Sequence, residues 1–82
     1  MAAEVSTALE EHVKRRLEDT FGKAVAMLIL ASATSAAKVP TADLTAGEYR
    51  RLVDAICCDQ RVLDMWGEDG AESARQEWLA LV

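Results

Sequence analysis

The longest uncharged stretch of the chain runs from residue 24 to residue 37, between Lys23 and Lys38. In the wider segment 17–37, apolar residues recur at spacings of four and three, as on one face of an α-helix; they are Leu17, Phe21, Ala24, Leu28 and Ala31. Other apolar residues lie between them, so we expect this helix to be enclosed nearly all round. The pattern predicts an all-α fold: a small helical bundle of one domain, residues 1–82, in which one long apolar helix carries two or three shorter helices.

Gly22 interrupts this pattern. Glycine costs up to about 1 kcal/mol inside a helix and often ends one. Two interpretations are open: one long helix over about residues 5–37, continuous or kinked, or two helices that meet at Gly22. The apolar face keeps its phase from Leu17 to Leu28, which favours the continuous or kinked helix.

The second half of the chain contains clearer local signals. Pro40 ends the apolar helix, because the residue before a proline is pushed out of the helical region. Thr45 and Glu48 then have the spacing of a capping box, so they predict a new helix at this point. The inward face of that helix consists of apolar residues at spacings of three, one and three, namely Tyr49, Leu52, Val53 and Ile56.

After Ile56 the apolar period restarts. Asp59 is a suitable N-cap for a short helix from Gln60 to Trp66, and Gly67 suits the position after its end. We expect residues 67–70 to form a turn, because two glycines flank two acids there. A last helix, from about residue 71 to the C-terminus, is predicted to bury Ala74, Trp78 and Leu81.

The size and composition of the chain favour association. A chain of 82 residues buries only about 60–65% of its unfolded surface, and much of the apolar content here is alanine, which adds little burial. We therefore expect a homodimer or a permanent partner. The predicted oligomer seam consists of Leu17, Phe21 and Leu28.

The distribution of charge argues against nucleic acid as a direct partner. The net charge is −5, from 14 acidic and 9 basic residues. The window 54–72 holds one base, Arg61, and six acids: Asp54, Asp59, Asp64, Glu68, Asp69 and Glu72. A surface that binds a duplex needs an excess of Lys and Arg. The unit from Thr45 to Trp66 is faintly similar to a helix-turn-helix, but its second helix carries little positive charge.

No residue pattern indicates catalysis or a bound cofactor. His12 has no partner in sequence, and the adjacent Cys57 and Cys58 lack the spacing and number of ligands of a zinc site. The acids from Asp59 to Glu72 do not fit a calcium loop, because Met65 and Trp66 stand where oxygen ligands are needed. We therefore predict no catalytic residue, no metal, no cofactor and no enzymatic activity.

What remains is an acidic surface with an aromatic residue in it, a composition common in protein interfaces. The predicted partner-binding residues are Asp59, Asp64, Trp66, Glu68, Asp69 and Glu72, although Trp66 is equally suited to the core. The favoured function is a small acidic regulator or inhibitor that docks on a basic protein surface.

Several alternatives to that function stay open. The chain could be a structural or accessory subunit of an oligomer, or a DNA-binding transcription regulator. By analogy of size and charge alone, it could also be a phage-type inhibitor of a nucleic-acid-binding defence complex. We expect a cytoplasmic protein with no membrane contact, because neither a signal peptide nor a spanning segment is visible.

Overall fold

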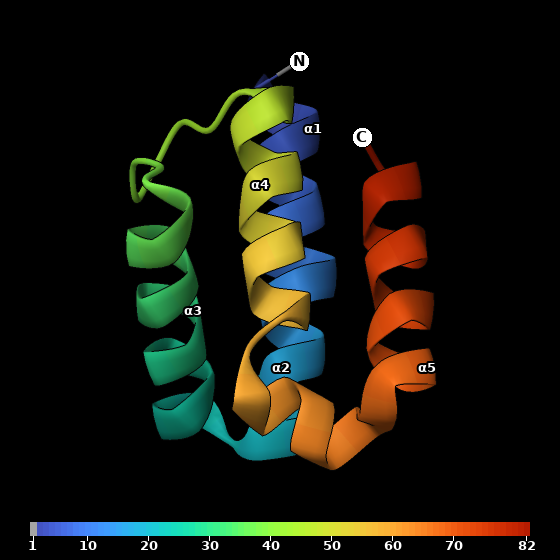
Figure 1. Ribbon diagram of the computed structural model, residues 1–82. Helices are drawn as coiled ribbons and strands as arrows, with labels where there is room; N and C mark the ends of the chain where they lie inside the picture. Colours follow the sequence, from blue (N-terminus) through green and yellow to red (C-terminus); the bar gives the residue numbers. More distant parts are fainter. Residues whose placement is uncertain (1) are drawn as a thin grey trace.

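The computed structural model describes the backbone of residues 2–82 and the side chains of residues 5–82. Its elements are α1 (Ala2–Thr7), the π-helical stretch η1 (Ala8–Val13), α2 (Lys14–Phe21), α3 (Lys23–Ala37), α4 (Ala46–Cys57) and α5 (Gln60–Ala80). The first three follow one another without a break and form one N-terminal rod (Figure 1). The described residues contain no strand. The predicted all-α bundle is therefore confirmed.

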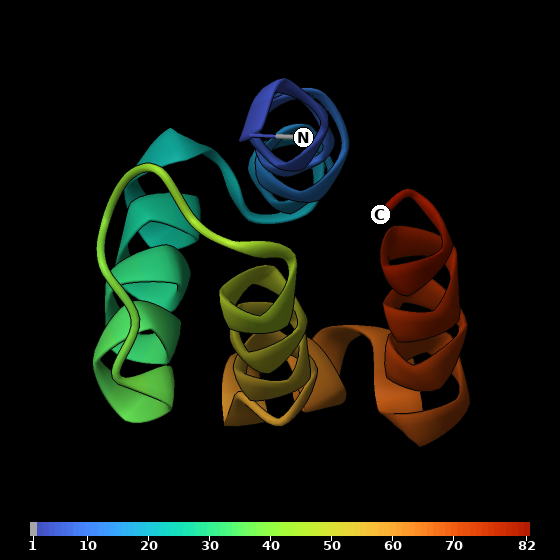
Figure 2. The same ribbon diagram turned by 90° about the horizontal axis from the view of Figure 1, so that it is seen from above.

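The helices form a layer of three with the rod packed against one side of it. In Figure 1, α4 lies in the middle of the layer and α3 lies at one edge. The other edge is the rising arm of α5, the part that follows the kink at Gly67. Figure 2 shows the rod lying on one side of this layer. Because α3 and α5 are at the edges, each keeps one side that no other helix covers.

Every helix of the bundle contributes side chains to the core. The largest fully buried side chains come from the rod, α3, α4 and α5; they are Tyr49, Leu17, Ile29, Ile56, Val13, Val53 and Val62. The predicted inward face of α4 is confirmed, because Tyr49, Leu52, Val53 and Ile56 are all buried. The Tyr49 hydroxyl donates a hydrogen bond of 2.8 Å to the Trp78 carbonyl, which fastens α4 to α5.

Gly22 separates two helices, so the favoured prediction of one continuous or kinked helix is wrong. Gly22 has φ 84° and ψ 165°, a backbone conformation that is almost restricted to glycine. Its N–H donates to the Glu18 carbonyl (2.8 Å), and its carbonyl accepts from the Ala26 N–H (3.0 Å). A single residue therefore ends α2 and begins α3, and the chain reverses direction there (Figure 1).

The reversal changes which residues of α3 are buried. Ala26, Ile29 and Ala33 face the core, whereas Met27 is 68% exposed and Leu28 is 57% exposed. The expected enclosure of this helix is therefore wrong. The apolar face counted across Gly22 is not one face, because its two halves belong to helices that run in opposite directions.

The capping signals of the second half are confirmed. The Glu48 N–H donates to Thr45 Oγ1 (3.2 Å), and the Thr45 N–H donates to Glu48 Oε1 (2.9 Å), which completes the capping box. Asp59 caps α5 as predicted. The predicted turn over residues 67–70 is wrong, because only Gly67 leaves the helical conformation there. Leu81, expected in the core, is 41% exposed.

Among the described residues, no helix has both the length and the apolar character that crossing a bilayer requires.

Candidate functional site

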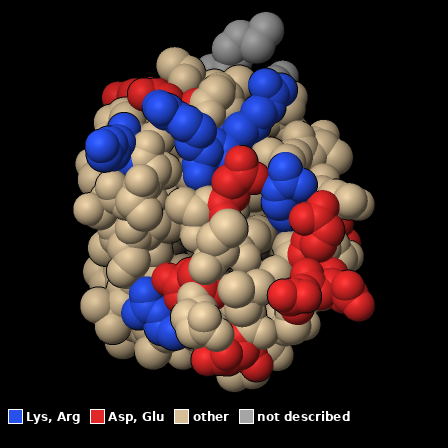
Figure 3. All heavy atoms as spheres, in the orientation of Figure 1, with Lys and Arg blue, Asp and Glu red and all other residues tan. Residues whose placement is uncertain are grey.

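The six predicted partner-binding residues all lie on α5 or at its N-cap. In Figure 3, acidic side chains gather on the side of the molecule where α5 rises. The contacts of these residues differ, however, and they divide into acids that are already paired, acids that are not, and one packed aromatic side chain.

Asp59 holds the start of α5 in place. Its Oδ1 accepts from the Arg61 backbone N–H (2.9 Å) and from Arg61 Nε (3.0 Å), while Oδ2 lies 2.8 Å from an Arg61 terminal nitrogen. Only 12% of the Asp59 side chain is exposed. The hydrogen bonds from Arg61 hold the pKa of Asp59 below its usual value. The negative charge of Asp59 is thus already neutralised by Arg61 of the same chain.

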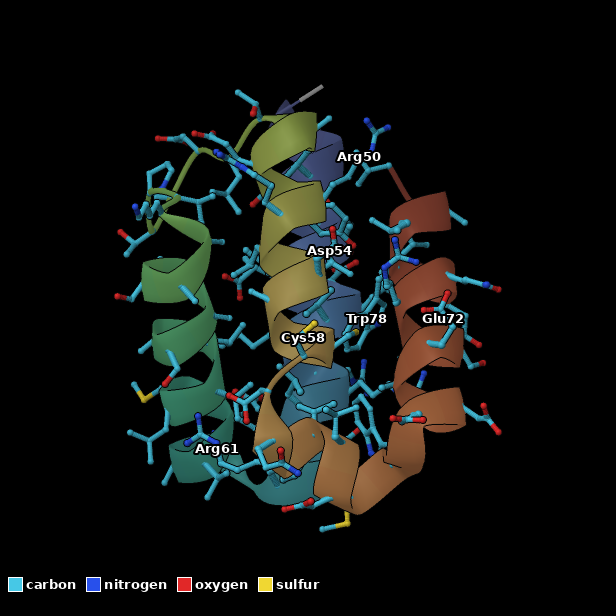
Figure 4. The ribbon with its side chains drawn as sticks, viewed as in Figure 1. Arg50, Asp54, Cys58, Arg61, Glu72 and Trp78 are labelled. Atoms are coloured by element: carbon cyan, nitrogen blue, oxygen red, sulfur yellow. The ribbon has the colours of Figure 1, made fainter. Side chains whose placement is uncertain are left out.

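Arg61 also reaches another helix. It donates from a terminal nitrogen to the Ser32 hydroxyl of α3 (3.2 Å), and Figure 4 shows its side chain directed toward α3. The Asp59–Arg61 pair therefore holds the N-terminal end of α5 against α3. It offers little unpaired charge to a partner.

Glu72 is engaged as well. It lies 3.1 Å from Arg75 and accepts a hydrogen bond from Gln76 (3.1 Å). Arg75 also binds Asp54 at 2.6 Å, so this network joins α5 to α4. In Figure 4 the labelled Asp54 and Glu72 lie on the neighbouring helices α4 and α5.

Three acids around the kink at Gly67 remain without a cationic partner. Asp64, Glu68 and Asp69 are exposed, and none of them forms a salt bridge with any side chain of residues 5–82. Asp64 accepts only a neutral hydrogen bond, from Gln60 (2.7 Å). These three therefore carry the uncompensated negative charge of the predicted site.

Trp66 is packed inside the kink. Its ring centroid is 6.0 Å from those of Phe21 and Trp78, and the Arg16 guanidinium lies 4.9 Å from the ring centroid. Arg16 is held in turn by Glu77 at 2.9 Å. This stack joins the N-terminal rod to the two arms of α5, before and after Gly67. Trp66 is half-buried, and its main contacts are with side chains of the same chain.

The exposed apolar residue beside the acids is Met65, which sequence analysis missed. Met65 is 59% exposed. A signal for it was present: Val62, Leu63 and Trp66 share the inward side of a helix, and residue 65 then falls outside it. We define the acidic kink surface as Asp64, Met65, Glu68 and Asp69.

A hollow of about 320 Å³ lies next to this surface, between α4 and α5. Its lining includes Glu68 together with both cysteines. Burial raises the pKa of the Cys57 thiol to about 12, so it is protonated at neutral pH, while Cys58 is exposed. Among the described residues, no three His, Cys, Asp or Glu side chains are grouped in a way that could hold a metal ion.

The predicted oligomer seam is not one surface. Leu17 is fully buried in the core of its own chain, and Phe21 packs against Trp66. Leu28 is exposed on the other side of the Gly22 reversal. Of the three residues, Leu28 alone is largely accessible to a partner.

No protein-family model, curated protein or solved structure matches this chain.

Proposed function

We propose that this protein is a small cytoplasmic regulator or inhibitor that docks its acidic kink surface on a basic surface of another protein. The observation that supports this function is the set of unpaired acids around an exposed methionine. Neighbouring acids of α5 and its N-cap, Glu72 and Asp59, have basic partners within the chain. Asp64, Glu68 and Asp69 have none among the described side chains of residues 5–82.

The composition of the surface suits such docking. Grouped exposed charges of one sign accelerate encounter with an oppositely charged partner and orient it before contact. Met65 adds an apolar, adaptable side chain in their midst, and methionine fits irregular partner surfaces well. Charge would then guide association, and Met65 would provide the contact that excludes water.

The surface is also preorganised. Gly67 has φ 74° and ψ 170°, a conformation almost restricted to glycine. The stack of Phe21, Trp66 and Trp78 holds the kink from inside. The backbone of this surface therefore needs little ordering when a partner binds, which lowers the entropic cost of binding.

The expected partner has basic side chains arranged in a groove or patch. One such class is a protein that binds nucleic acid through that groove, in which case the acidic kink surface would compete with phosphates. The proposed action needs no chemistry at the site, and we accordingly propose a binding protein and no enzyme.

The partner can be identified by comparing three forms of the protein as baits in the native host. The test variant carries Asp64→Lys, Glu68→Lys and Asp69→Lys. The matched control carries Glu11→Lys, Glu18→Lys and Asp19→Lys on the N-terminal rod, three acids that form no salt bridge with the side chains of residues 5–82. Both variants therefore have the same net charge. The proposal expects a basic protein that the parent and the control enrich at least tenfold over the test variant. Equal enrichment by all three forms contradicts it.

A structural or accessory subunit is the second candidate function, and the exposure of Met27 and Leu28 favours it. This candidate makes the opposite prediction for the same baits. Reversal of the kink acids would be tolerated, and truncation of the exposed apolar residues of α3 would abolish assembly.

A further inference from the structure

The outward side of α3 is apolar although no other helix of the bundle covers it. Ala24, Met27, Leu28 and Ala31 are all exposed, and the helix has no charged residue from 24 to 37. In Figure 3, the middle of the left side of the molecule, where Figure 1 places α3, shows no charged side chain. A helix on the surface of a bundle normally has its charged and polar residues on this side.

The exposed apolar residues continue into a groove. A groove of about 420 Å³ lies between α3 and the N-terminal rod, and Met27 and Ala31 form part of its wall. Leu9, Leu30 and Leu44 also line it, together with Glu10 and Lys14, which form a salt bridge with each other (3.4 Å). Exposed apolar patches that continue into a groove mark contact sites more often than single exposed residues do.

The order of residue sizes along this side is symmetric. It reads small, large, large, small: Ala24, Met27, Leu28 and Ala31. A two-fold axis through the midpoint between Met27 and Leu28 places Ala24 of one copy opposite Ala31 of a second copy running antiparallel. The large residues then meet at the crossing point, with alanines on both sides that allow the helices to approach closely. A patch that is its own complement is what a two-fold interface requires.

We propose that α3 is a self-association surface, on which two copies of this chain pair antiparallel about the midpoint between Met27 and Leu28. The lack of charge supports a second copy as the occupant. Between residues 24 and 37, α3 has no charge that would be buried unpaired in such a pair, and none that would select a charged partner. Lys23 is the first residue of α3 and lies at the end of the helix, away from the crossing point. Antiparallel helices also place opposite ends of their dipoles side by side.

The size of the surface indicates a weak and reversible dimer. A helix of 15 residues is about 22 Å long, and a contact strip about 10 Å wide gives roughly 200–250 Å² of projected area per copy. Stable complexes bury about 800 Å² per partner. The groove adds to the strip, but the total stays at the low end, so we expect dissociation constants in the micromolar range or weaker.

This surface is separate from the acidic kink surface. α3 lies at one edge of the layer, and the arm of α5 after Gly67, which carries Glu68 and Asp69, lies at the other edge (Figures 1 and 2). Asp64 and Met65 belong to the arm before Gly67, which lies at the bottom of the bundle in Figure 1. The two copies can therefore pair while both acidic kink surfaces remain accessible. A result that rejects one of the two proposals leaves the other unaffected.

Analytical ultracentrifugation of the full chain tests the proposal over a range from about 10 µM to about 1 mM. Met27→Lys is the test variant, and Met65→Lys is the matched control, because both methionines are exposed, 68% and 59% respectively. We expect the parent and the control to shift from monomer to dimer, and Met27→Lys to weaken dimerisation at least tenfold. Leu28→Lys should have the same effect, with an unchanged helical circular dichroism spectrum in every variant. A parent that stays monomeric at the highest concentration, or a dimer that Met27→Lys leaves intact, overturns the proposal.

Disulfide trapping tests the register in a Cys58→Ser background, which removes the exposed native thiol. In the proposed two-fold pair, a mixture of Ala24→Cys and Ala31→Cys chains should form a mixed disulfide dimer, because these positions face each other across the axis. Each variant alone should cross-link at least tenfold more slowly. Equal cross-linking by Ala24→Cys alone would contradict the antiparallel register.

Discussion

Tyr49 connects two helices through one buried hydroxyl. The side chain is fully buried, and its hydrogen bond to the Trp78 carbonyl joins α4 to the end of α5. Burial raises the pKa of Tyr49 to about 12 from the ordinary 10.0, because the phenolate would lose its hydration inside the protein.

This shift can be measured without interference, since the chain contains a single tyrosine. We expect the ultraviolet absorbance of tyrosinate to appear well above pH 10 in the folded protein. Between about pH 10 and pH 12 the unfolded chain releases the Tyr49 proton and the folded chain retains it. Stability attributable to Tyr49 is therefore fully present below pH 10 and lost as the pH rises through this window.

The control for this titration is Tyr49→Phe, which removes the hydroxyl. We expect it to lower the free energy of unfolding at neutral pH by about 0.5–1.5 kcal/mol, because the Trp78 carbonyl keeps a hydrogen bond from the Leu81 N–H (3.3 Å). A tyrosinate midpoint near pH 10 under conditions where circular dichroism shows an intact fold would contradict the buried position of Tyr49.

At the scale of elements, the reversal at Gly22 decides the topology of the N-terminal half. Chemical denaturation of Gly22→Ala tests it. A Cβ at this position would contact nothing within 4 Å, so the cost is confined to the backbone conformation, about 1–3 kcal/mol. We expect Gly22→Ala to destabilise the protein by that amount.

The matched control is Gly47→Ala, because Gly47 lies in the first turn of α4 and its φ is not positive. Alanine is the better helix former there, so we expect a gain in stability of a few tenths to about 1 kcal/mol. A stabilising Gly22→Ala substitution would instead indicate that a continuous helix runs through residue 22.

The two faces of α3 provide a second test at this scale. Ile29 is fully buried and Leu28 is 57% exposed. In dilute solution, Ile29→Ala should lower the free energy of unfolding by about 2–5 kcal/mol through the cavity it leaves. Leu28→Ala should cost less than about 1 kcal/mol, because little of its contact area is lost. Thermal or urea unfolding would measure both, and equal losses would show that the outward side of α3 is assigned wrongly.

The contrast between α4 and α3 shows what the sequence could predict. The capping box at Thr45 and the cap at Asp59 depend on residues within three positions of each other, so their signals are complete in the local sequence. The direction of α3 depends on the single backbone conformation of Gly22. Apolar spacing cannot reveal it, because the count from Leu17 to Leu28 is the same whether the chain continues or reverses.

The candidate site was predictable to a similar extent. The sequence shows that acids gather between residues 59 and 72, but it could not show that Arg61 and Arg75 neutralise some of them. Arg75 binds Asp54 of α4 as well as Glu72 of α5, and that arrangement exists only once the two helices pack together. Trp66 could be core or surface until the positions of Phe21 and Trp78 around it were known.

At the scale of the whole molecule, charge and apolar surface are separated. The unpaired acids lie around the kink at Gly67 in α5, and the exposed apolar side of α3 lies at the edge of the layer opposite the rising arm of α5 (Figure 1). If both proposals hold, the protein would pair with itself through α3 and still present its acids to a basic partner. Two linked acidic kink surfaces would raise the avidity for a partner that has two basic sites.

The association rate with the captured basic partner tests the central claim most directly. It should be measured at low and at physiological ionic strength for the parent, for the lysine variant of Asp64, Glu68 and Asp69, and for the control variant of the N-terminal rod. We expect the parent rate to fall as salt rises, because exposed charges are screened beyond about 8 Å at physiological ionic strength.

At low salt, the kink variant should associate at least about tenfold more slowly than the control variant of equal net charge, while circular dichroism shows that both are folded. A specific slowing of this kind would establish that the position of the acids matters and that total charge alone does not explain association. Equal rates for the two variants would contradict the account.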